Sequence, residues 1–597
     1  MIRSSSIYVF VSVFAVSLAL EKSSRAAETT VLAPIVVEGS TADVLLYDPI
    51  VFTRVAPVAP TSSNGSVVRK FEEELPVPVT DFGTPGTTTQ LRGLGRTVED
   101  TNVQTLGVPL NPVIGGGFDF SSFPEFFWSN YSFHLGPSTG GFDPRAASGT
   151  LSLMPWTSAA LRGNGGKANA LARVTELVSK GLNQASVAGA YGNAAALVGL
   201  SSYNAQGPTG SLSARLAQDD RFDLRAHLLA TSIDRTSPGP NTDPTPNARL
   251  KTTRWIPILE ANVSPTHELL IKESAFYDRN AVRFVNPDSS ALDSYDRSSQ
   301  IGSETVALWK DWTFGLSLRR TEFTQIGGEA PQEWIGHLQA ERIFRAGSWT
   351  TQASAQADWM NLYGARPGAS LGERYDITSD WGVFAKTNFT YRYPSLQDRY
   401  YQGASFVANP NLSLERALSF NIGNQWKHGQ FEATEQFYFQ FRSNAQLLQF
   451  NSNTGLLSVM NGGEVRQLSY WDDLTWHALP YLDLGNALRL SSSRVDLSAS
   501  RIPYDPLLTE IVNLRFHQAS DQPFWNVGGA LRVVTSSPDG LGGTNGGYSL
   551  FDLNAGLRYQ NLGLQGRIDN VLDRRIQVYQ GYPWPGRLFS LSLIAAL

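Results

Sequence analysis

The sequence predicts an all-β membrane protein, an antiparallel transmembrane β-barrel of ~22 strands with an N-terminal plug domain inside its lumen. Two observations lead to this fold class. Apolar and polar residues alternate along many short runs from about residue 161 to the C-terminus. Before these runs, residues 90–157 contain three short β-type segments separated by turns rich in Gly and Pro. The first pattern is typical of strands, and the second provides a compact insert.

The alternation gives each strand one apolar face and one mostly polar face. It is clearest in residues 431–441, 549–559 and 588–597. A membrane barrel turns the apolar face to lipid, because backbone groups exposed to lipid must all be paired within the sheet. The residues after Ala160 suffice for ~20–24 spanning strands, and a barrel of ~22 strands has a wide lumen that needs a plug. The apolar positions of the three segments are Phe431, Ala433, Phe437, Phe439, Phe441, Phe551, Leu553, Ala555, Leu557, Tyr559, Phe589, Leu591, Leu593, Ala595 and Leu597.

The N-terminus has the pattern of an export signal. Arg3 gives a positive start, residues 7–20 form an apolar run, and small residues offer a cleavage point after Ala26 or Ala27. The run is shorter than the ~20 residues of a membrane-spanning helix, and a buried core helix is the alternative. The expected domains are a signal peptide at 1–27, a periplasmic tether at 28–66, a plug at 67–160 and a transmembrane barrel at 161–597.

Composition narrows the possible functions. The net charge of −5 lacks the general basic footprint of a nucleic-acid-binding protein, so no nucleic-acid partner is expected. Cysteine is absent, which removes disulfides, thiolate metal sites and a cysteine nucleophile. Aromatic residues make up 11% and charged residues only 17%, a balance that fits aromatic girdles at a membrane surface. Residues 40–85, rich in Pro, Thr, Ser and Val, show no convincing helical period and are expected to be irregular.

The sequence contains no complete catalytic motif. Residues 136–140 fit the G-x-S-x-G pattern of a hydrolase elbow, but Pro144 blocks the helix that this motif requires. His267 and Glu268 lack the second His of a zinc-binding helix, and no complete P-loop is present. The sequence therefore predicts a protein that is not an enzyme and that has no cofactor or resident metal.

Four parts of the chain, in this order, carry a family resemblance: the plug, the middle of the barrel, the penultimate strands and the closing strand. The plug segments read LRGLG, LGVPLN, GGGFDFSSFP and LGPSTGGFDPRAASGTLSLM, and the mid-barrel segment reads YRYPSLQDRYY followed by NPNLSLER. The end of the chain holds YSLFDLNAGLRY, RIDNVLDRR with an Asn570–Asp573 turn, and a closing strand. Together they resemble a TonB-dependent outer-membrane receptor of the siderophore or cobalamin type. The chain departs from the family where Leu106 and Leu135 replace the usual Asp and Arg.

The resemblance implies a TonB box near the N-terminus. Ile35, Val36, Val37 and Glu38 lie where the family carries this segment, which binds by adding a strand to an edge of its partner. An ordinary first strand is the alternative reading of the same residues. The implied partner is a TonB-like periplasmic energy-coupling protein.

The resemblance also places ligand contacts on plug loops that face outward and on outer barrel loops. The candidates in the plug are Asn111, Val113, Ile114, Gly115, Thr139, Phe142 and Asp143, and those in an outer loop are Tyr400, Tyr401 and Phe406. The glycines and prolines near the plug candidates can equally serve only to shape turns. The aromatic candidates can equally sit in the interfacial girdle.

The expected protein is a monomer in the lipid of the bacterial outer membrane. It would bind a scarce small-molecule metal chelate, such as a ferric siderophore or cobalamin, and import it with energy delivered by the TonB-like partner. Two other functions stay open. One is a plugged surface receptor or adhesin without transport, suggested by the departures in the plug, and the other is a passive porin.

Overall fold

The computed structural model describes residues 53–57 and 67–596, apart from 84–85, 96–97, 114–115, 136–148, 158–160, 162–169, 178–180, 192, 202–204, 242, 290–292, 326–329, 404–405, 452–455, 496–500, 519–523 and 540–541. In this part of the chain, no helix is both long and apolar enough to cross a membrane. The described chain is dominated by one closed antiparallel barrel of 22 strands, which confirms the predicted fold class.

The barrel runs in sequence order and closes between its last strand and its first, so no strand edge is left open. Its strands are β8 (Ala170–Leu177), β9 (Gly181–Tyr191), β10 (Ala194–Ser201), β11 (Ala205–Gln218), β12 (Phe222–Thr236), β13 (Arg249–Thr266), β14 (Leu269–Val285), β15 (Ser294–Trp309), β16 (Trp312–Gln325), β17 (Gln332–Ala346), β18 (Trp349–Met360), β19 (Gly364–Thr378), β20 (Trp381–Arg392), β21 (Glu415–His428), β22 (Phe431–Ser443), β25 (Val465–Leu479), β26 (Leu482–Val495), β27 (Leu508–His517), β28 (Phe524–Val534), β31 (Tyr548–Tyr559), β32 (Leu562–Asp569) and β35 (Leu588–Ala596). The closing pair joins Ser590 to Leu177 and Ala596 to Leu171.

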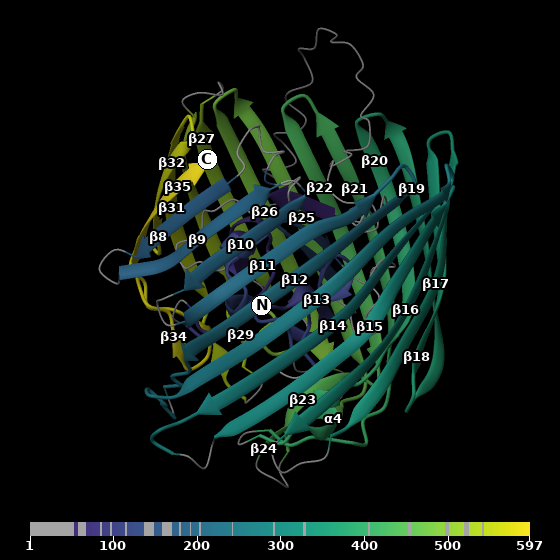
Figure 1. Ribbon diagram of the computed structural model, residues 1–597, viewed down its shortest axis with the longest axis horizontal. Coiled ribbons are helices and arrows are strands. Elements are labelled where there is room, and N and C mark those ends of the chain that lie inside the picture. The colour runs from purple at the N-terminus through teal and green to yellow at the C-terminus, as the bar shows by residue number, and fades with distance from the viewer. Residues whose placement is uncertain are drawn as a thin grey trace, which may run out of the picture. The chain divides into compact units, whose positions relative to one another are not determined.

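The two ends of the barrel differ in their connections. At the short-turn end most neighbouring strands are joined by two residues, as at 310–311 and 429–430. At the long-loop end the connections include 393–414, 444–464 and 570–587. The long loops hold α4 (Leu396–Tyr400) and the pairs β23 (Gln446–Asn451) with β24 (Leu456–Asn461), β29 (Ser537–Pro538) with β30 (Thr544–Asn545) and β33 (Gln577–Tyr579) with β34 (Tyr582–Pro583). In Figure 1 the C-terminus marks the short-turn end, and α4, β23 and β24 lie at the opposite end.

The predicted alternation places apolar side chains outside and polar ones inside. On β22, Phe437 and Phe439 are exposed, whereas Gln436, Tyr438 and Gln440 are buried. The closing strand does the same, with Leu591 and Leu593 exposed and Ser592 buried. Large apolar side chains cover the outside of the other strands in the same way, which is the surface that a lipid bilayer solvates. Trp309, Trp349, Trp381, Trp426 and Trp476 are exposed near the short-turn end, as expected of an aromatic girdle.

The segment that precedes the barrel folds into a small mixed structure, here called the plug. Its five-stranded sheet has the order β1-β6-β7-β4-β5. The elements are β1 (Thr53–Pro57), α2 (Val67–Glu74), β2 (Val79–Asp81), β3 (Thr89–Leu91), β4 (Thr101–Thr105), β5 (Val108–Pro109), β6 (Trp128–Leu135) and β7 (Gly149–Pro155), with 3₁₀ turns η2 (Gly93–Gly95), η3 (Val98–Asp100), η4 (Phe120–Ser122) and η5 (Glu125–Phe127). Strand β1 falls in the segment predicted as tether and pairs with β6.

Helix α2 corrects one expectation. The residues 40–85 show no helical period in sequence, yet Val67–Glu74 form a helix that ends before Pro76. Val68, Phe71 and Leu75 are buried against the plug core, where the Phe71 ring lies 4.7 Å from that of Tyr131. These three residues follow the spacing of one helix face, and packing of this apolar side supplies the stability of so short a helix.

Arginines of the barrel wall hold the plug in the lumen. Arg254 Nη2 donates to the Leu110 carbonyl at 2.7 Å, and Arg532 donates to the carbonyls of Glu72 and Val77. Three more wall arginines pair with plug carboxylates, Arg235 with Asp119 at 2.5 Å, Arg173 with Glu125 at 3.8 Å and Arg567 with Glu73. Apart from the longer Arg173–Glu125 ion pair, these contacts are charge-assisted hydrogen bonds, which are stronger than neutral ones.

Candidate functional site: the covered apex of the plug

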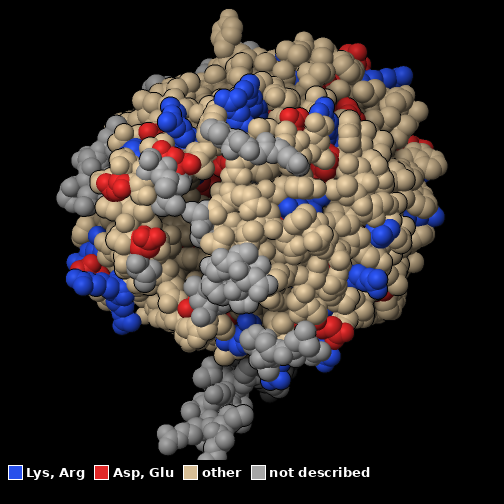
Figure 2. Space-filling view, turned by 90° about the horizontal axis from the view of Figure 1, so that it is seen from below, with Lys and Arg blue, Asp and Glu red and all other residues tan. Residues whose placement is uncertain are grey.

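A loop and a hairpin at the long-loop end together form a structure here called the cap, which consists of residues 393–403 and 406–414 and the β23–β24 pair. Within it, Ser395 begins α4 by accepting a hydrogen bond from the Asp398 N–H at 3.1 Å. The loop is fastened to the hairpin, because Val407 N donates to the Leu457 carbonyl at 2.8 Å and Asn409 Nδ2 to the Val459 carbonyl at 3.1 Å. Figure 2 views this end, where charged side chains form small scattered groups and uncharged residues cover most of the described surface.

The cap lies directly on the apex of the plug, defined as residues 98–100, 111–113 and 116–117. The Gly116 N–H donates to Gln397 Oε1 at 2.7 Å, which joins the apex to α4. Between them remains a cavity of about 10 Å³, lined by Glu99, Asn111, Pro112, Val113, Gly116, Ser395 and Gln397. A cavity of this volume holds about one water molecule. Among the described residues, α4 therefore lies close against Asn111, Val113 and Gly116 and leaves little space between cap and apex.

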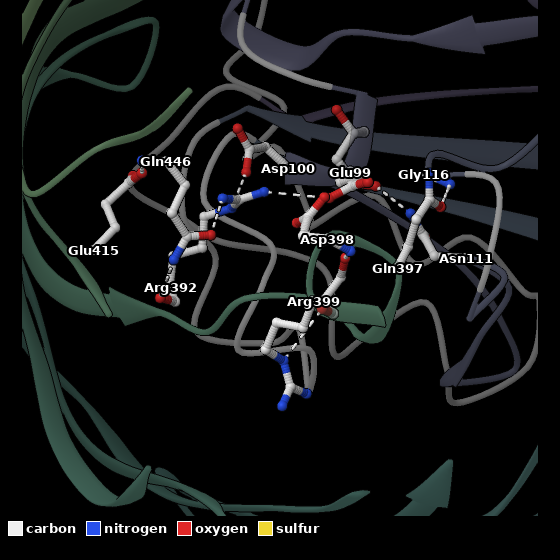
Figure 3. Close-up of polar contacts among 12 residues, drawn as sticks. Glu99, Asp100, Asn111, Gly116, Arg392, Gln397, Asp398, Arg399, Glu415 and Gln446 are labelled. Carbon is white, nitrogen blue, oxygen red and sulfur yellow. Dashed lines mark hydrogen bonds and ion pairs between the residues drawn. The ribbon is translucent and has the colours of Figure 1, made fainter. Parts of the chain in front are cut away.

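Arg392, the last residue of β20, connects the barrel wall to the apex (Figure 3). Its Nε lies 2.5 Å from Asp100 Oδ1, and its Nη2 lies 3.4 Å from Glu99 Oε2. The same guanidinium donates to the side chain of Gln446, whose backbone N–H donates to Glu415 Oε2 at 2.9 Å. One side chain thus links the barrel, the plug and the cap hairpin.

The Glu99 carboxyl has an unusually high pKa. Burial raises its pKa most, the neighbouring Asp398 carboxyl also raises it, and Arg392 acts in the opposite direction, which together give a pKa of about 8. Asp398 belongs to α4, and its carboxyl faces Glu99 across the contact between cap and apex (Figure 3). A proton on Glu99 allows the two carboxyl groups to lie together, and its loss places two like charges there.

An apolar cluster lies beside the charged contact, the name used here for Arg392, Glu99, Asp100, Gln397 and Asp398. Val113 of the apex, Phe323 of β16 and Leu396 of α4 are all buried together, with Tyr400 and Tyr401 packed against them. The Tyr401 ring lies 6.3 Å from that of Phe323 and 6.2 Å from that of Phe406. Apolar burial therefore adds to the ionic contact in keeping the cap closed.

The structure brings the described members of the predicted ligand site together. Asn111 and Val113 lie at the apex, and Tyr400, Tyr401 and Phe406 lie in the cap above them, not in the exterior girdle. The Asn111 side chain accepts from the Val103 N–H at 2.7 Å and donates to the Thr101 carbonyl at 2.9 Å, so it also braces β4. Outside the described residues lie Ile35, Val36, Val37, Glu38, Ile114, Gly115, Thr139, Phe142 and Asp143.

Sequence reasoning missed the residues of the charged contact. Glu99, Asp100, Gln397 and Asp398 were not predicted as site residues, and Arg392 was quoted only as part of a motif. That motif, residues 392–395 in the mid-barrel segment, was the available signal. It could not reveal the partner, because Glu99 lies almost three hundred residues earlier in the chain.

The fold defines a class of protein, a plugged 22-stranded membrane β-barrel. No protein-family model matches the chain, and no curated protein matches it by sequence. Solved structures match it closely in fold: the FrpB iron transporter (F3-3 variant) from Neisseria meningitidis with a TM-score of 0.74 and 13% identity, the copper transporter OprC with 0.77 and 13%, and the siderophore receptor PirA from Acinetobacter baumannii with 0.75 and 12%. The alignments cover 91%, 92% and 92% of this chain and 99% of each of those chains. The resemblance stated from sequence is thereby confirmed at the level of the fold.

Proposed function

We propose that the protein is an active importer of the bacterial outer membrane that binds a scarce metal chelate from outside. The observation that carries this proposal is the filled and covered lumen. A barrel that serves passive diffusion needs an open path, whereas here the chain's own N-terminal segment occupies the path and the cap lies over it. Passage of any solute therefore requires two rearrangements, of the cap and of the plug.

The chelate is the finer part of the proposal. The solved structures of the same fold are described as iron and copper transporters and siderophore receptors, and one of them holds enterobactin. The apex and cap offer aromatic rings and carboxyl groups to a ligand, from Tyr400, Tyr401, Phe406 and Glu99. Growth of a strain lacking this protein under iron limitation and under cobalamin limitation separates the two chelate classes, because a defect in one condition alone identifies the limiting nutrient.

Energy for the rearrangement would come from a TonB-like partner. A ligand shifts a two-state equilibrium only by its differential affinity for the two states. The charge-assisted contacts between wall and plug make opening costly, so an external pull on the plug's N-terminal extension is a physically sufficient means. Residues 35–38 are the proposed handle, since Ile and Val favour the extended conformation that strand addition requires.

The direct test is energy-dependent uptake of the chelate that the growth experiment selects. Deletion of residues 33–39 should abolish uptake while ligand binding persists. Val36→Pro should do the same, because proline lacks the N–H that strand pairing uses, and Val36→Thr is the matched control that keeps it. Uptake at the wild-type rate after the deletion would contradict the proposed binding of the TonB-like partner to residues 35–38. Binding by the wild-type protein without any energy-dependent uptake would instead favour a surface receptor.

A further inference from the structure

A group of cations lies on the outer face of the barrel wall, near its long-loop end. Lys251 of β13, Arg279 and Arg283 of β14 and Arg297 of β15 are all exposed. They share the outer face because the residues between them, such as Thr252, Arg254 and Asp278, point inward and are buried. The strand register sets Lys251 opposite Arg283, and Arg283 opposite Tyr295. Three adjacent strands thus bring four positive charges together on a surface whose neighbours are lipid.

These cations are not neutralised by the carboxylates around them. Nearby Arg249 pairs with Asp234 at 2.7 Å and Arg320 with Glu322 at 3.3 Å. Within the described chain, no carboxylate pairs with Lys251, Arg279, Arg283 or Arg297, and Arg297 Nε only donates to the Tyr295 hydroxyl at 2.8 Å. An uncompensated cluster on a lipid-facing wall is costly unless an anion meets it.

The cluster surrounds a groove. The groove has a volume of about 530 Å³ and a floor of small side chains, Thr253 and Ala281, which face each other in the register. Lys251, Arg279 and Arg283 stand around it, with the rings of Trp255 and Tyr295 at its sides. The small residues leave room between the long cationic side chains, so the groove accepts a group the size of a lipid headgroup rather than a single ion.

The depth of the groove in the membrane follows from the strands. On β15, Trp309 of the short-turn girdle lies 12 residues after Arg297 (309 − 297). At ~3.4 Å per residue and a tilt of ~40°, this spacing corresponds to about 31 Å along the barrel axis, somewhat more than the ~25 Å apolar band of such barrels. Toward the middle of the barrel the Trp255 ring lies 5.2 Å from that of Tyr277, followed by exposed Leu259 and Ile301. The cations therefore lie at the headgroup level of the leaflet on the long-loop side.

We infer that this groove binds the phosphate-bearing headgroup of a lipid in that leaflet. Two arginines and a lysine supply the charge and the hydrogen-bond donors that phosphate oxygens accept. The acyl chains would lie along Trp255, Tyr277 and Leu259, where aromatic rings mark the boundary between headgroups and hydrocarbon. The site is separate from the lumen and does not depend on import.

Native mass spectrometry of the purified full chain tests this site. The probes are diphosphorylated lipid A, phosphatidylcholine, whose phosphate is offset by choline, and inorganic phosphate. Lipid A should stay bound to the wild type, phosphatidylcholine should not, and inorganic phosphate should not displace lipid A. A triple variant, Lys251→Gln, Arg279→Gln and Arg283→Gln, should bind lipid A roughly 100-fold more weakly, because each cation near a charged membrane surface contributes about a factor of five.

The matched control removes three exposed cations at the short-turn end, with Arg345→Gln, Lys427→Gln and Arg558→Gln. It should retain lipid A like the wild type. Equal retention by both triple variants, or equal loss from both, would overturn the site. Displacement by inorganic phosphate would also overturn it, since the ligand would then be a small anion. The single variant Arg283→Gln, expected to bind several-fold more weakly, repeats the test should the triple variant differ in thermal stability.

Discussion

Arg392 belongs to the barrel wall, yet its guanidinium contacts Asp100 at 2.5 Å and Glu99 at 3.4 Å in the plug. Asp100 is 1% exposed, so the nearby Arg392 guanidinium stabilises its buried carboxylate. Removing one partner of a buried ion pair leaves an uncompensated charge, which costs about 3–5 kcal/mol. At the scale of single residues, Arg392 thus attaches the apex of the plug to the barrel wall.

Arg392→Met should accelerate hydrogen exchange in residues 98–105 by at least ~100-fold, the factor that follows from a loss of about 3 kcal/mol. Exchange in the barrel strands should not change. Arg345→Met is the control, because its pair with Asp311 at 3.5 Å is exposed on both sides and contributes at most about 1 kcal/mol. Unchanged exchange at 98–105 in the Arg392 variant would show that the ion pair does not hold the apex.

Glu99 makes the closed cap sensitive to pH. Its pKa in the folded protein, about 8, lies above the ordinary 4.5 because of burial and the nearby Asp398. The contribution of a carboxyl with a raised pKa is fully present below the ordinary value and is lost as the pH rises through the folded value. The contact between cap and apex should therefore weaken as the pH rises from about 4.5 to about 8.

Glu99→Gln should remove most of that dependence, because the amide never ionises. We expect proteolytic cleavage in residues 393–403 to become faster between pH 6 and pH 9 in the wild type, relative to an unstructured peptide of the same sequence, and to stay nearly constant in the variant. The same pH response in both proteins would mean that Glu99 does not control the cap.

At the scale of elements, α4 keeps the cap packed against the apex of the plug. Leu396 is fully buried between Val113 of the plug and Phe323 of the wall. Truncating a buried leucine to alanine costs about 2–5 kcal/mol. The loss would fall on the contact between cap and apex, since the barrel strands do not depend on this cluster for their pairing.

Leu396→Ala should raise hydrogen exchange in residues 393–403 and at residues 116–117, and should leave the thermal midpoint of the barrel unchanged. Leu362→Ala provides the matched control, because Leu362 is 55% exposed in a turn at the same end of the barrel. If both variants exchange at the same rate in 393–403, the apolar cluster does not keep the cap closed.

Some elements follow directly from local sequence. Phe437 and Phe439 point outward and Gln436 and Gln440 point inward. This is the alternation expected of a strand with one face toward lipid and the other toward a polar lumen. The Asn570–Asp573 turn is equally local: Asn570 and Asp573 both have φ of 52°, which Asn and Asp adopt more readily than other residues, and Asn570 Oδ1 accepts from the Arg574 N–H at 3.0 Å.

Other features depend on contacts between distant segments and are not readable from a run of residues. Helix α2 spans only two turns, and its stability depends on packing around Phe71 in the plug core. The contact of Arg392 with Glu99 and Asp100 arises from the fold of the plug inside the barrel. Leu106 is similar: at φ 53° it occupies a turn position that favours Asn or Asp, while its burial and the bond from Ser274 Oγ to its carbonyl at 3.1 Å suit the plug interior.

At the scale of the whole molecule, the wall arginines and the cap act on the same segment from two directions. Arg254, Arg532 and Arg235 hold the sides of the plug, and Gln397 and Arg392 hold its apex. Release at one end leaves the other contacts in place. This arrangement favours a closed resting state of the lumen, and under the proposed function a ligand and an external force would act together to open it.

The electrical conductance of the purified full-length protein in planar lipid bilayers tests this account most directly. It needs neither the ligand nor the energy-coupling partner. We predict that single insertions leave the bilayer nearly non-conducting at low voltage, because the plug and the cap close the lumen. A large and steady conductance in each insertion, typical of an open diffusion pore, would contradict the account.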